Sequence, residues 1–292
     1  MPEGDTIFRA ARTLRAVLEG RMIVAIASPL AAIADAGLVG RKIESVEARG
    51  KNLTLTFDDR RVLHTHMRMD GAWHLYHPGE PWKRAAWRAR VVLEVSGAVA
   101  VCFDAPIVRL LSASLARSAP ELASLGPDIL APNFDPMVAR ANLRARGADG
   151  RVQIADALLD QSALAGIGNV FKCEVLFVEK TNPFCPIASL TDDALDAIIA
   201  RAKQLMVRNI APGQRMRTVR RDAPGARFYV YGRSGQSCFT CGTRIAMRRQ
   251  GPHARSTYFC PTCQNCPEFA SAEGAQHPSA EGAQQGRERR GP

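Results

Sequence analysis

Two pairs of cysteines near the C-terminal end constrain the fold more than any other feature of the chain. Cys238-x-x-Cys241 and Cys260-x-x-Cys263 are separated by residues 242–259. Two Cys-x-x-Cys pairs at such a spacing supply four thiolates and are typical of a zinc ribbon. The flanking segments "YGRSGQ" and "RSTYFCPTC" favour a two-stranded hairpin with a metal knuckle at the base of each strand. We therefore expect one structural zinc ion, because four thiolates leave no open position for a reacting water.

The other cysteines have less specific surroundings. Cys102, Cys173 and Cys185 lie in apolar patterns, which favours small core residues. Cys266 is a fifth cysteine beside the two pairs, and it is either a spare thiol or an alternative ligand. A chain without a membrane span or a secretion signal is expected in the cytoplasm, where disulfides are rare and clustered cysteines more often hold metal.

The charge balance points to a polyanionic partner. The net charge is +11 and the isoelectric point is about 9.7. Such an excess of Lys and Arg favours binding to nucleic acid or to an acidic membrane surface. No stretch approaches the ~18 apolar residues of a membrane span, and the opening "MPEGD" lacks the charge pattern of a secretion signal. We therefore expect no membrane association.

Hydrophobic periodicity predicts a sheet-rich first domain at residues 1–119. A helix is expected from Thr6 to Gly20, followed by several short strands. In "NLTLTF", residues 53, 55 and 57 share one side of a strand, and "WRARVVLEVSGAVAVCF" predicts a hairpin that turns at residues 96–97. The length of 292 residues is sufficient for two domains.

The rest of the chain is predicted to be helical up to the cysteine pairs. Prolines mark a linker at 120–136, and residues 212–228 form a basic loop with five arginines and little periodicity, which predicts mobility. The tail repeats "SAEGAQ" and is predicted to be disordered. The predicted helices are 137–146, 152–164, 168–179 and 191–208, and the predicted domains after the linker are 137–228 (helical), 229–267 (zinc finger) and 268–292 (tail).

Three short segments carry candidate binding residues, each with an ordinary alternative. "AGIGN", ending at Asn169, lies between two helical patterns and could bring backbone amides to a phosphate, although simple helix packing gives the same pattern. Lys51 enters a strand, where most lysines are only solvated. In "HMRMDG", Met69 is either a core residue or an apolar wedge that enters a base stack.

The first residues raise a further possibility. A small residue such as Pro2 generally permits removal of Met1, and the chain would then start with a secondary amine beside Glu3. An α-amine titrates near ~8 and a lysine near ~10.4, so the terminal amine is more readily unprotonated. A terminal secondary amine can form a charged iminium, which is an electron sink like the Schiff bases of lysine enzymes. The alternative is a ragged, solvated terminus.

Six motifs in order resemble the formamidopyrimidine-DNA glycosylase and endonuclease VIII family of base-excision repair enzymes, over roughly residues 1–264. They are "MPEGDT", "RGKNL", "HMRMDGAW", "SLGPDIL", "LLDQSALAGIGNVFKCEVLF" and "VYGRSGQSCFTCG…RSTYFCPTCQ". The resemblance implies an α+β fold with an N-terminal β-sandwich-like domain, a leading helix, a helical helix-two-turns-helix domain and a zinc-ribbon hairpin. It also implies a monomeric bifunctional DNA glycosylase and apurinic/apyrimidinic (AP) lyase that binds damaged DNA in the cytoplasm, associated with the nucleoid.

The resemblance also implies roles for single residues. Pro2 matches the nucleophile that attacks the sugar, and Glu3 matches the acid–base residue that opens the sugar ring. Lys51 and Arg255 complete the catalytic set as phosphate-contacting groups, and strand cleavage would proceed by β,δ-elimination. Asn169 and Arg255 match residues that grip phosphates around the lesion. Met69 matches the residue that fills the gap left by the flipped base.

Three departures from the family pattern bear on the substrate. Thr6 stands where the opening motif usually has a glutamate, and Asp5 is a possible substitute. "CFDAPIVRLL" contains Arg109, but the phenylalanine that accompanies this arginine and completes the wedge in the formamidopyrimidine branch is missing beside it. The loop 212–228 has no clear match to that branch's cap over oxidised guanine. These departures favour the endonuclease VIII branch and oxidised pyrimidines. Two alternatives stay open: an oxidised-purine glycosylase, or a catalytically silent zinc protein that binds nucleic acid.

Overall fold

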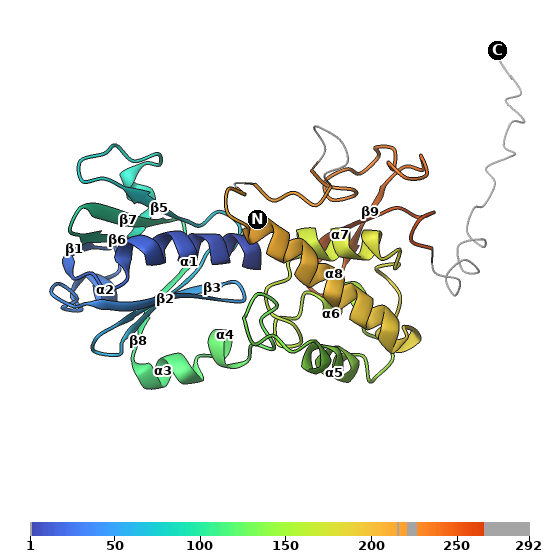
Figure 1. Ribbon diagram of the computed structural model, residues 1–292, viewed down its shortest axis with the longest axis horizontal. Helices are drawn as coiled ribbons and strands as arrows, with labels where there is room; N and C mark the ends of the chain where they lie inside the picture. The colour runs from blue at the N-terminus through green and yellow to red at the C-terminus, as the bar shows by residue number, and fades with distance from the viewer. Residues whose placement is uncertain (1, 215, 221–226, 266–292) are drawn as a thin grey trace, which may run out of the picture.

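Two four-stranded antiparallel sheets form the N-terminal part of the molecule, at the left of Figure 1. Their strand orders are β1-β6-β7-β5 and β2-β3-β4-β8. The first sheet contains β1 (Ile23–Ala27), β6 (Ala89–Val95), β7 (Ala98–Phe103) and β5 (Ala72–Tyr76), and the second contains β2 (Ile43–Arg49), β3 (Asn52–Phe57), β4 (Val62–His66) and β8 (Ile107–Leu111). The predicted hairpin is present, because β6 pairs with β7 and Gly97 takes the left-handed conformation of the turn, with φ of 81°.

Helix α1 (Gly4–Leu18) supplies part of the core of this sandwich. Its apolar residues recur at helical spacing, so Ile7, Leu14 and Leu18 lie on one buried face. The helix begins two residues earlier than the sequence predicts. The reason lies outside the helix, because the backbone N–H of Gly4 donates to the carbonyl of Gly166, 2.9 Å away.

Strand β3 is buried on both faces. Leu53 and Leu55 face the sandwich core as the alternation predicts, but Asn52 on the opposite face is buried as well. The amide of Asn52 donates to the carbonyl of Glu121 at 3.1 Å, and its oxygen lies 2.8 Å from Nε2 of His64. The polar face of the strand is therefore covered by the segment that follows the sandwich, which contains α3 (Ala113–Ser118) and α4 (Pro120–Ala123).

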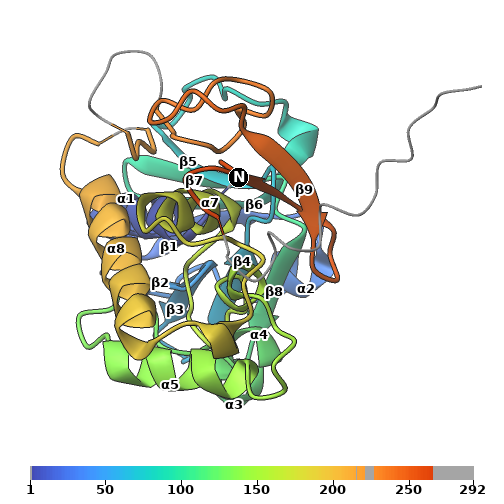
Figure 2. The same ribbon diagram turned by 90° about the vertical axis from the view of Figure 1, so that its right-hand side faces the viewer.

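Helices form the opposite half of the molecule, as Figure 2 shows from that end. Helix α8 flanks α7, with α5 below them and β9 on the other side. The helices are α5 (Pro136–Arg146), α6 (Ile154–Ala157), α7 (Asn169–Val178) and α8 (Asp192–Ile210), and the shorter elements of the chain are α2 (Ala31–Ala34), η1 (Ala86–Arg88) and η2 (Ile187–Ser189).

The predicted helix at 152–164 is wrong for most of its length, because only α6 is helical. Side chains hold the following residues in turns instead. Asp160 accepts the backbone N–H of Ser162 at 2.9 Å, and the amide of Gln161 donates to the carbonyls of Leu159 and Ile167. Such local side-chain bonds compete with a helical ladder. Directly after this segment, the backbone N–H of Ala165 donates to the carbonyl of Pro127, a linker residue, at 3.0 Å.

Helix α7 is shared by two cores, which explains its almost entirely apolar sequence. Phe171 and Val175 pack among the other helices, whereas Cys173 and Phe177 pack against the cysteine-rich segment. A helix that is apolar all round is expected to be buried. That segment ends in an antiparallel hairpin of β9 (Ala246–Gln250) and β10 (Arg255–Phe259), as predicted.

The structure, a computed structural model, describes residues 2–214, 216–220 and 227–265. The prediction of a disordered tail at 268–292 and the role of Cys266 fall outside the described residues, as does part of the predicted basic loop. Among the described helices, none combines the length and the apolar character needed to cross a membrane. The mixed α+β class with a sandwich, a helical domain and a cysteine-rich hairpin is confirmed.

Candidate active site and metal centre

The side chain of Glu3 occupies the N-terminal end of helix α7. Its carboxylate accepts backbone N–H groups from Val170 at 2.8 Å, Gly168 at 3.2 Å and Phe171 at 3.3 Å. The first N–H groups of a helix have no partner within the helix, and the helix dipole favours a negative charge at that end. Glu3 satisfies these donors and is itself completely buried. The start of the chain is therefore fixed to the helical domain.

The glycines of "AGIGN" make this contact possible. A Cβ atom on Gly168 would lie 2.3 Å from both Cγ and Cδ of Glu3. Gly166 adopts φ of 106°, and its Cα atom would lie 2.9 Å from a Cβ atom on Gly4. The predicted turn is thus a close approach between the backbone and Glu3, and simple helix packing does not account for it.

Pro2 precedes Glu3 and is half-exposed. Because Glu3 is bound at α7 and Gly4 is bound to Gly166, the backbone on both sides of Glu3 is held in place. Pro2 therefore lies at the junction of the sandwich and the helical domain.

Lys51 lies in the tight turn between β2 and β3, on the sandwich side of this junction. The preceding residue, Gly50, has φ of 58°, and its N–H donates to the carboxylate of Asp128 at 2.7 Å. Burial of the amine lowers the pKa of Lys51 to about 8, because desolvation disfavours the ammonium form. Glu3 opposes this shift, and the positive charges of Arg255 and Arg217 add to it.

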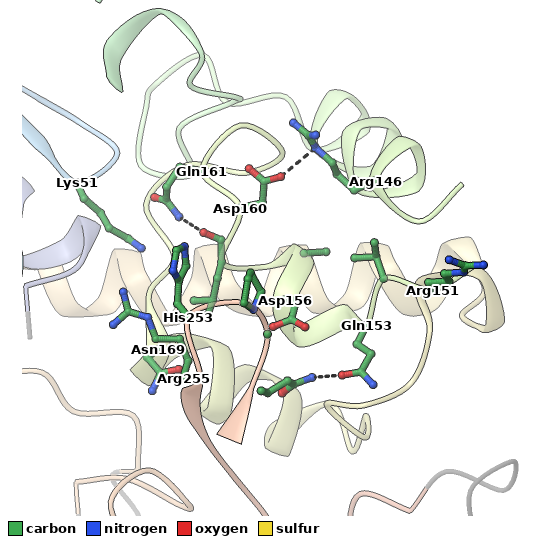
Figure 3. Close-up of a pocket in the computed structure, with 16 residues that line it drawn as sticks. Lys51, Arg146, Arg151, Gln153, Asp156, Asp160, Gln161, Asn169, His253 and Arg255 are labelled. Atoms are coloured by element: carbon green, nitrogen blue, oxygen red, sulfur yellow. Dashed lines mark hydrogen bonds and ion pairs between the residues drawn. The ribbon is translucent and has the colours of Figure 1, made fainter. Parts of the chain in front are cut away.

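A cavity of about 790 Å³ opens between the helical domain, the hairpin and Lys51 (Figure 3). Lys51, Asn169 and Arg255 line it together, and they come from the sandwich, from the start of α7 and from the start of β10. His253 lies among them, whereas Arg151 lies at the other end. The structure thus brings together three residues that the sequence predicts as phosphate contacts.

Two contacts align the hairpin with helix α7. The side-chain amide of Asn169 donates to the carbonyl of Ser256 at 2.8 Å, beside Arg255. One turn later, the amine of the buried Lys172 donates to the hydroxyl of Thr257 at 2.7 Å. Burial lowers the pKa of Lys172. Arg255 itself is exposed at the start of β10, where a guanidinium can reach a ligand in the cavity.

Sequence reasoning missed Lys172 and Glu174 as structural supports of this site. Glu174 is completely buried and accepts the backbone N–H groups of Tyr229, Val230 and Tyr231 at 2.7–2.9 Å. Burial raises the pKa of Glu174 to about 7, and these N–H donors oppose the rise. Two charged residues inside the apolar run "VFKCEVLF" were the available signal, because a buried charge needs partners.

Sequence reasoning also missed Arg217, which belongs to the predicted basic loop. Its side chain is buried and forms a two-pronged ion pair with Asp5, with Nε 3.0 Å from Oδ2. This arginine is therefore held in the protein interior, although the sequence predicts a mobile basic loop. No local pattern marked it, because its partner Asp5 lies 212 positions earlier in the chain.

The two methionines of "HMRMDG" differ in burial. Met67 is buried in the sandwich core, whereas Met69 is 52% exposed. Arg68 between them has φ of 48°, which turns the chain outward. Met69 is not among the residues that line the cavity. Arg109, the other candidate near the wedge, lies on β8 and pairs with Glu121 at 2.9 Å.

Four cysteine sulfurs form a cluster at the base of the hairpin. All four Sγ atoms lie within 4.8 Å of one another, with Cys238 and Cys263 at 3.9 Å and Cys241 and Cys260 at 3.4 Å. Four thiolates about 2.3 Å from a tetrahedral ion are about 3.8 Å from one another. The cluster could therefore hold a metal ion, and the geometry fits the set of four ligands that the spacing predicts.

Comparison with known proteins agrees with this arrangement. The model described as formamidopyrimidine-DNA glycosylase N-terminal domain matches residues 1–106, and the model described as formamidopyrimidine-DNA glycosylase H2TH domain matches residues 125–220. The solved structure of Lactococcus lactis formamidopyrimidine DNA glycosylase, bound non-covalently to DNA with an AP site, has a TM-score of 0.75. It is 22% identical, and the match covers 91% of this chain and all of that chain, so this likeness shows the fold.

Curated relatives are more similar in sequence. A protein of Streptomyces coelicolor named probable endonuclease 8 2 is 38% identical, covering 91% of this chain and 95% of the relative. A DNA-(apurinic or apyrimidinic site) lyase of Mycolicibacterium smegmatis is 37% identical, covering 90% and 99%. Endonuclease 8 of Escherichia coli is 29% identical, covering 91% and 100%. With both family models matched over most of its length and these relatives aligned end to end, the chain belongs to the formamidopyrimidine-DNA glycosylase family, which includes endonuclease 8.

Proposed function

We propose that this protein is a base-excision repair DNA glycosylase with AP lyase activity, and that Pro2 is its nucleophile. The observation that carries the proposal is the position of Glu3, which is fixed on the N-terminal end of α7 next to Pro2 and interacts electrostatically with Lys51. The names of the relatives, endonuclease 8 and DNA-(apurinic or apyrimidinic site) lyase, support the same reaction class.

The proposed chemistry uses the amine that Pro2 carries once Met1 is removed. The unprotonated nitrogen attacks C1′ of the damaged nucleotide, and the glycosidic bond breaks with its electron pair going to the base. The Glu3 carboxylate takes the proton that the nitrogen loses and delivers it to the ring oxygen as the C1′–O4′ bond opens, and the departing base anion takes a proton from water. The product is an iminium between Pro2 and C1′, with the positive charge on nitrogen.

The same adduct explains strand cleavage. The iminium withdraws electrons and acidifies the C2′ hydrogen, so loss of that proton expels the 3′ phosphate in β-elimination. A second elimination expels the 5′ phosphate, and water then hydrolyses the iminium to release Pro2. A silent DNA-binding protein would need neither a free amine at residue 2 nor a carboxylate held beside it.

The cavity residues are proposed to hold the DNA backbone. Lys51 and Arg255 supply positive charge, and Asn169 supplies an uncharged donor near the N-terminal end of α7. Met69, which is exposed on its loop, is proposed to fill the space that a flipped base leaves. All these groups belong to one chain, which supports a monomer, and the bacterial relatives support action on DNA in the cytoplasm.

The metal is proposed to be one structural zinc ion, held by the four clustered thiolates. Zinc prefers four-coordinate tetrahedral sites with thiolate ligands, and the separations of the four sulfurs fit that geometry. Bound there, zinc supplies folding energy to the segment that ends in the hairpin and carries Arg255.

Oxidised pyrimidines are the proposed substrates. The support is the endonuclease 8 name of the relatives, together with the absence of an aromatic residue beside Arg109, where Val108 and Leu110 stand. The test compares single-turnover rates on duplexes with thymine glycol and with 8-oxoguanine opposite cytosine. Faster release of thymine glycol is expected. Faster release of 8-oxoguanine would favour the oxidised-purine alternative, and release of neither base, without cleavage at an abasic site, would contradict the proposed activity.

A further inference from the structure

The guanidinium of Arg217 lies between the two acidic residues at the start of the chain. Two of its nitrogens pair with the carboxylate of Asp5, and its third, Nη1, lies 3.6 Å from Oε1 of Glu3. Its Nη2 also donates to the hydroxyl of Thr6 at 3.0 Å. Asp5 and Glu3 are completely buried and Arg217 is 9% exposed. The pairs are therefore poorly screened by solvent, and their geometry matters.

Arg217 also contacts the helix that binds Glu3. Its guanidinium carbon lies 5.1 Å from the centre of the Phe171 ring, a cation–π distance. The backbone N–H of Phe171 is one of the three donors to Glu3. A single side chain thus contacts Glu3, the helical turn that follows Glu3, and the helix end on which Glu3 rests.

The backbone around Arg217 is anchored to α8. The neighbouring Thr218 donates its N–H to the side-chain oxygen of Asn209 at 2.8 Å, and its carbonyl accepts the Asn209 amide at 3.1 Å. Asn209 is fully buried, so the anchor is not a surface contact. The guanidinium therefore approaches the acidic residues from a defined position.

Arg9 also pairs with Asp5, but its contacts differ from those of Arg217. Arg9 lies 3.7 Å from Oδ2 of Asp5, but its Nη1 also donates to the carbonyl of Asn209 at 2.7 Å. No contact joins Arg9 to Glu3 among the described interactions. Lys51 interacts with Glu3 electrostatically, but Lys51 itself lies in the cavity that would receive DNA.

We propose that Arg217 is a positioning residue for base release, which holds the Glu3 carboxyl group in the orientation that delivers a proton to the sugar. Asp5 is its partner, and Thr6, which stands where related motifs have glutamate, accommodates the guanidinium through its hydroxyl. The inference rests on the proposed function. Without the guanidinium, Asp5 is left buried beside Arg9 and Thr6 alone, and the turn from Glu3 to Asp5 loses its link to α7.

Comparison of base release with cleavage at an abasic site distinguishes a positioning role of Arg217 from a contribution to folding. Base release requires proton delivery to a closed sugar ring. At a preformed abasic site the ring is already in equilibrium with its aldehyde, so ring opening depends less on Glu3. A displaced Glu3 therefore slows base release more than it slows cleavage of an abasic site. A variant that is only partly folded loses both activities by the same factor.

The test measures single-turnover rates for Arg217→Met, Arg217→Lys, the control Arg12→Met and the wild-type protein. Each is assayed on the faster of the two oxidised-base duplexes and on a duplex with a preformed abasic site. Affinity is measured separately on a duplex containing a tetrahydrofuran abasic analogue. Arg12 is a suitable control, because it also joins α1 to the end of α8, through the carbonyl of Ile210, but is exposed and contacts neither acidic residue.

In Arg217→Met, base release should fall by about a hundredfold, the effect of a catalytic group displaced by about 1 Å. Abasic cleavage should fall less than about tenfold and affinity less than about threefold, since neither depends on Glu3 to that degree. Arg217→Lys should be intermediate, because an ammonium keeps the charge but cannot form the two-pronged contact. Arg12→Met should retain both rates.

Equal loss of both reactions in Arg217→Met, or base release within about threefold of wild type, would overturn the inference. If Arg217→Met does not fold, Arg217→Lys provides the test. A ratio of base release to abasic-site cleavage equal to that of the wild-type protein in Arg217→Lys would contradict a positioning role. Failure of the proposed function is distinguishable, because the wild-type protein would then act on none of the substrates.

Discussion

The carboxylate of Glu3 lies 2.8 Å from the backbone N–H of Val170, although 167 positions separate the two residues in the chain. This bond joins the start of the sandwich domain to the first turn of α7. The same turn carries Asn169, whose amide is bonded to the hairpin. The proposed acid–base residue, the proposed DNA contact and the hairpin are thus connected through one helix end.

Substitution of Gly168 tests this contact. Gly168→Ala would place a Cβ atom 2.3 Å from the Glu3 side chain and displace the carboxylate, so we expect base release to fall about a hundredfold. Gly147→Ala is the matched control, because its Cβ would meet Ile187 at 2.7 Å in the same half of the molecule, away from Glu3. The control should lower the melting temperature but leave the rate per folded molecule unchanged. Wild-type base release by Gly168→Ala would contradict the role of the contact.

The metal cluster predicts a joint loss of two properties. Cys260→Ser removes one of four thiolates, so the protein should lose its zinc and most of its affinity for DNA. The sandwich should stay folded, because its core contains none of these cysteines. Metal analysis and circular dichroism of the purified variant check both points. A full equivalent of zinc in Cys260→Ser would disprove the assignment.

Salt dependence separates the two proposed backbone contacts. Arg255→Ala removes a charge that contacts phosphate, so the slope of log K against log salt should become shallower by about 0.9. Asn169→Ala removes an uncharged amide and should weaken binding with little change of slope. Fluorescence titrations from 50 to 200 mM salt, roughly the range where such effects are large, measure both. An unchanged slope in Arg255→Ala would show that Arg255 does not neutralise a phosphate.

Binding should also depend on pH through Lys51. With its pKa lowered to about 8, Lys51 loses its positive charge as the pH rises from 7 to 9, and affinity for DNA should fall over that range. An ordinary lysine would remain charged to about pH 10. Lys51→Arg stays protonated and should remove this pH dependence. The lowered pKa of Lys51 affects the free energy of unfolding in the opposite direction. Between about pH 8 and pH 10.5 Lys51 is protonated in the unfolded state but not in the folded state, so stability rises with pH over that range. Identical pH profiles for wild type and Lys51→Arg would contradict this account.

The sequence was sufficient to predict the elements that depend on local patterns. These elements are the strand β3, the hairpin at Gly97 and the cysteine cluster. Each is encoded by a pattern in its own residues. The family and the fold class were also predicted and are confirmed. The assigned roles of the site residues and the domain boundaries stay predictions.

The elements that could not be predicted depend on side-chain contacts that hydrophobic periodicity does not reveal. The segment 152–164 has helical periodicity, but Gln161 and Asp160 bond to the backbone and hold it in turns against the linker. Arg217 lies in a segment with five arginines, and its local sequence does not indicate the ion pair with Asp5. A contact between residues 212 positions apart becomes visible only in the folded structure.

Reductive trapping tests the central claim most directly. If Pro2 is the nucleophile, borohydride should reduce the iminium and link the protein to lesion-containing or abasic DNA, and mass spectrometry of the linked peptide should place the bond at residue 2. One extra residue ahead of Pro2 should abolish trapping, because the amine becomes an amide without a basic lone pair. Glu3→Gln should lose most base release but keep some trapping on abasic DNA. Strong trapping by the extended form, with the link mapped to Lys51, would contradict the account.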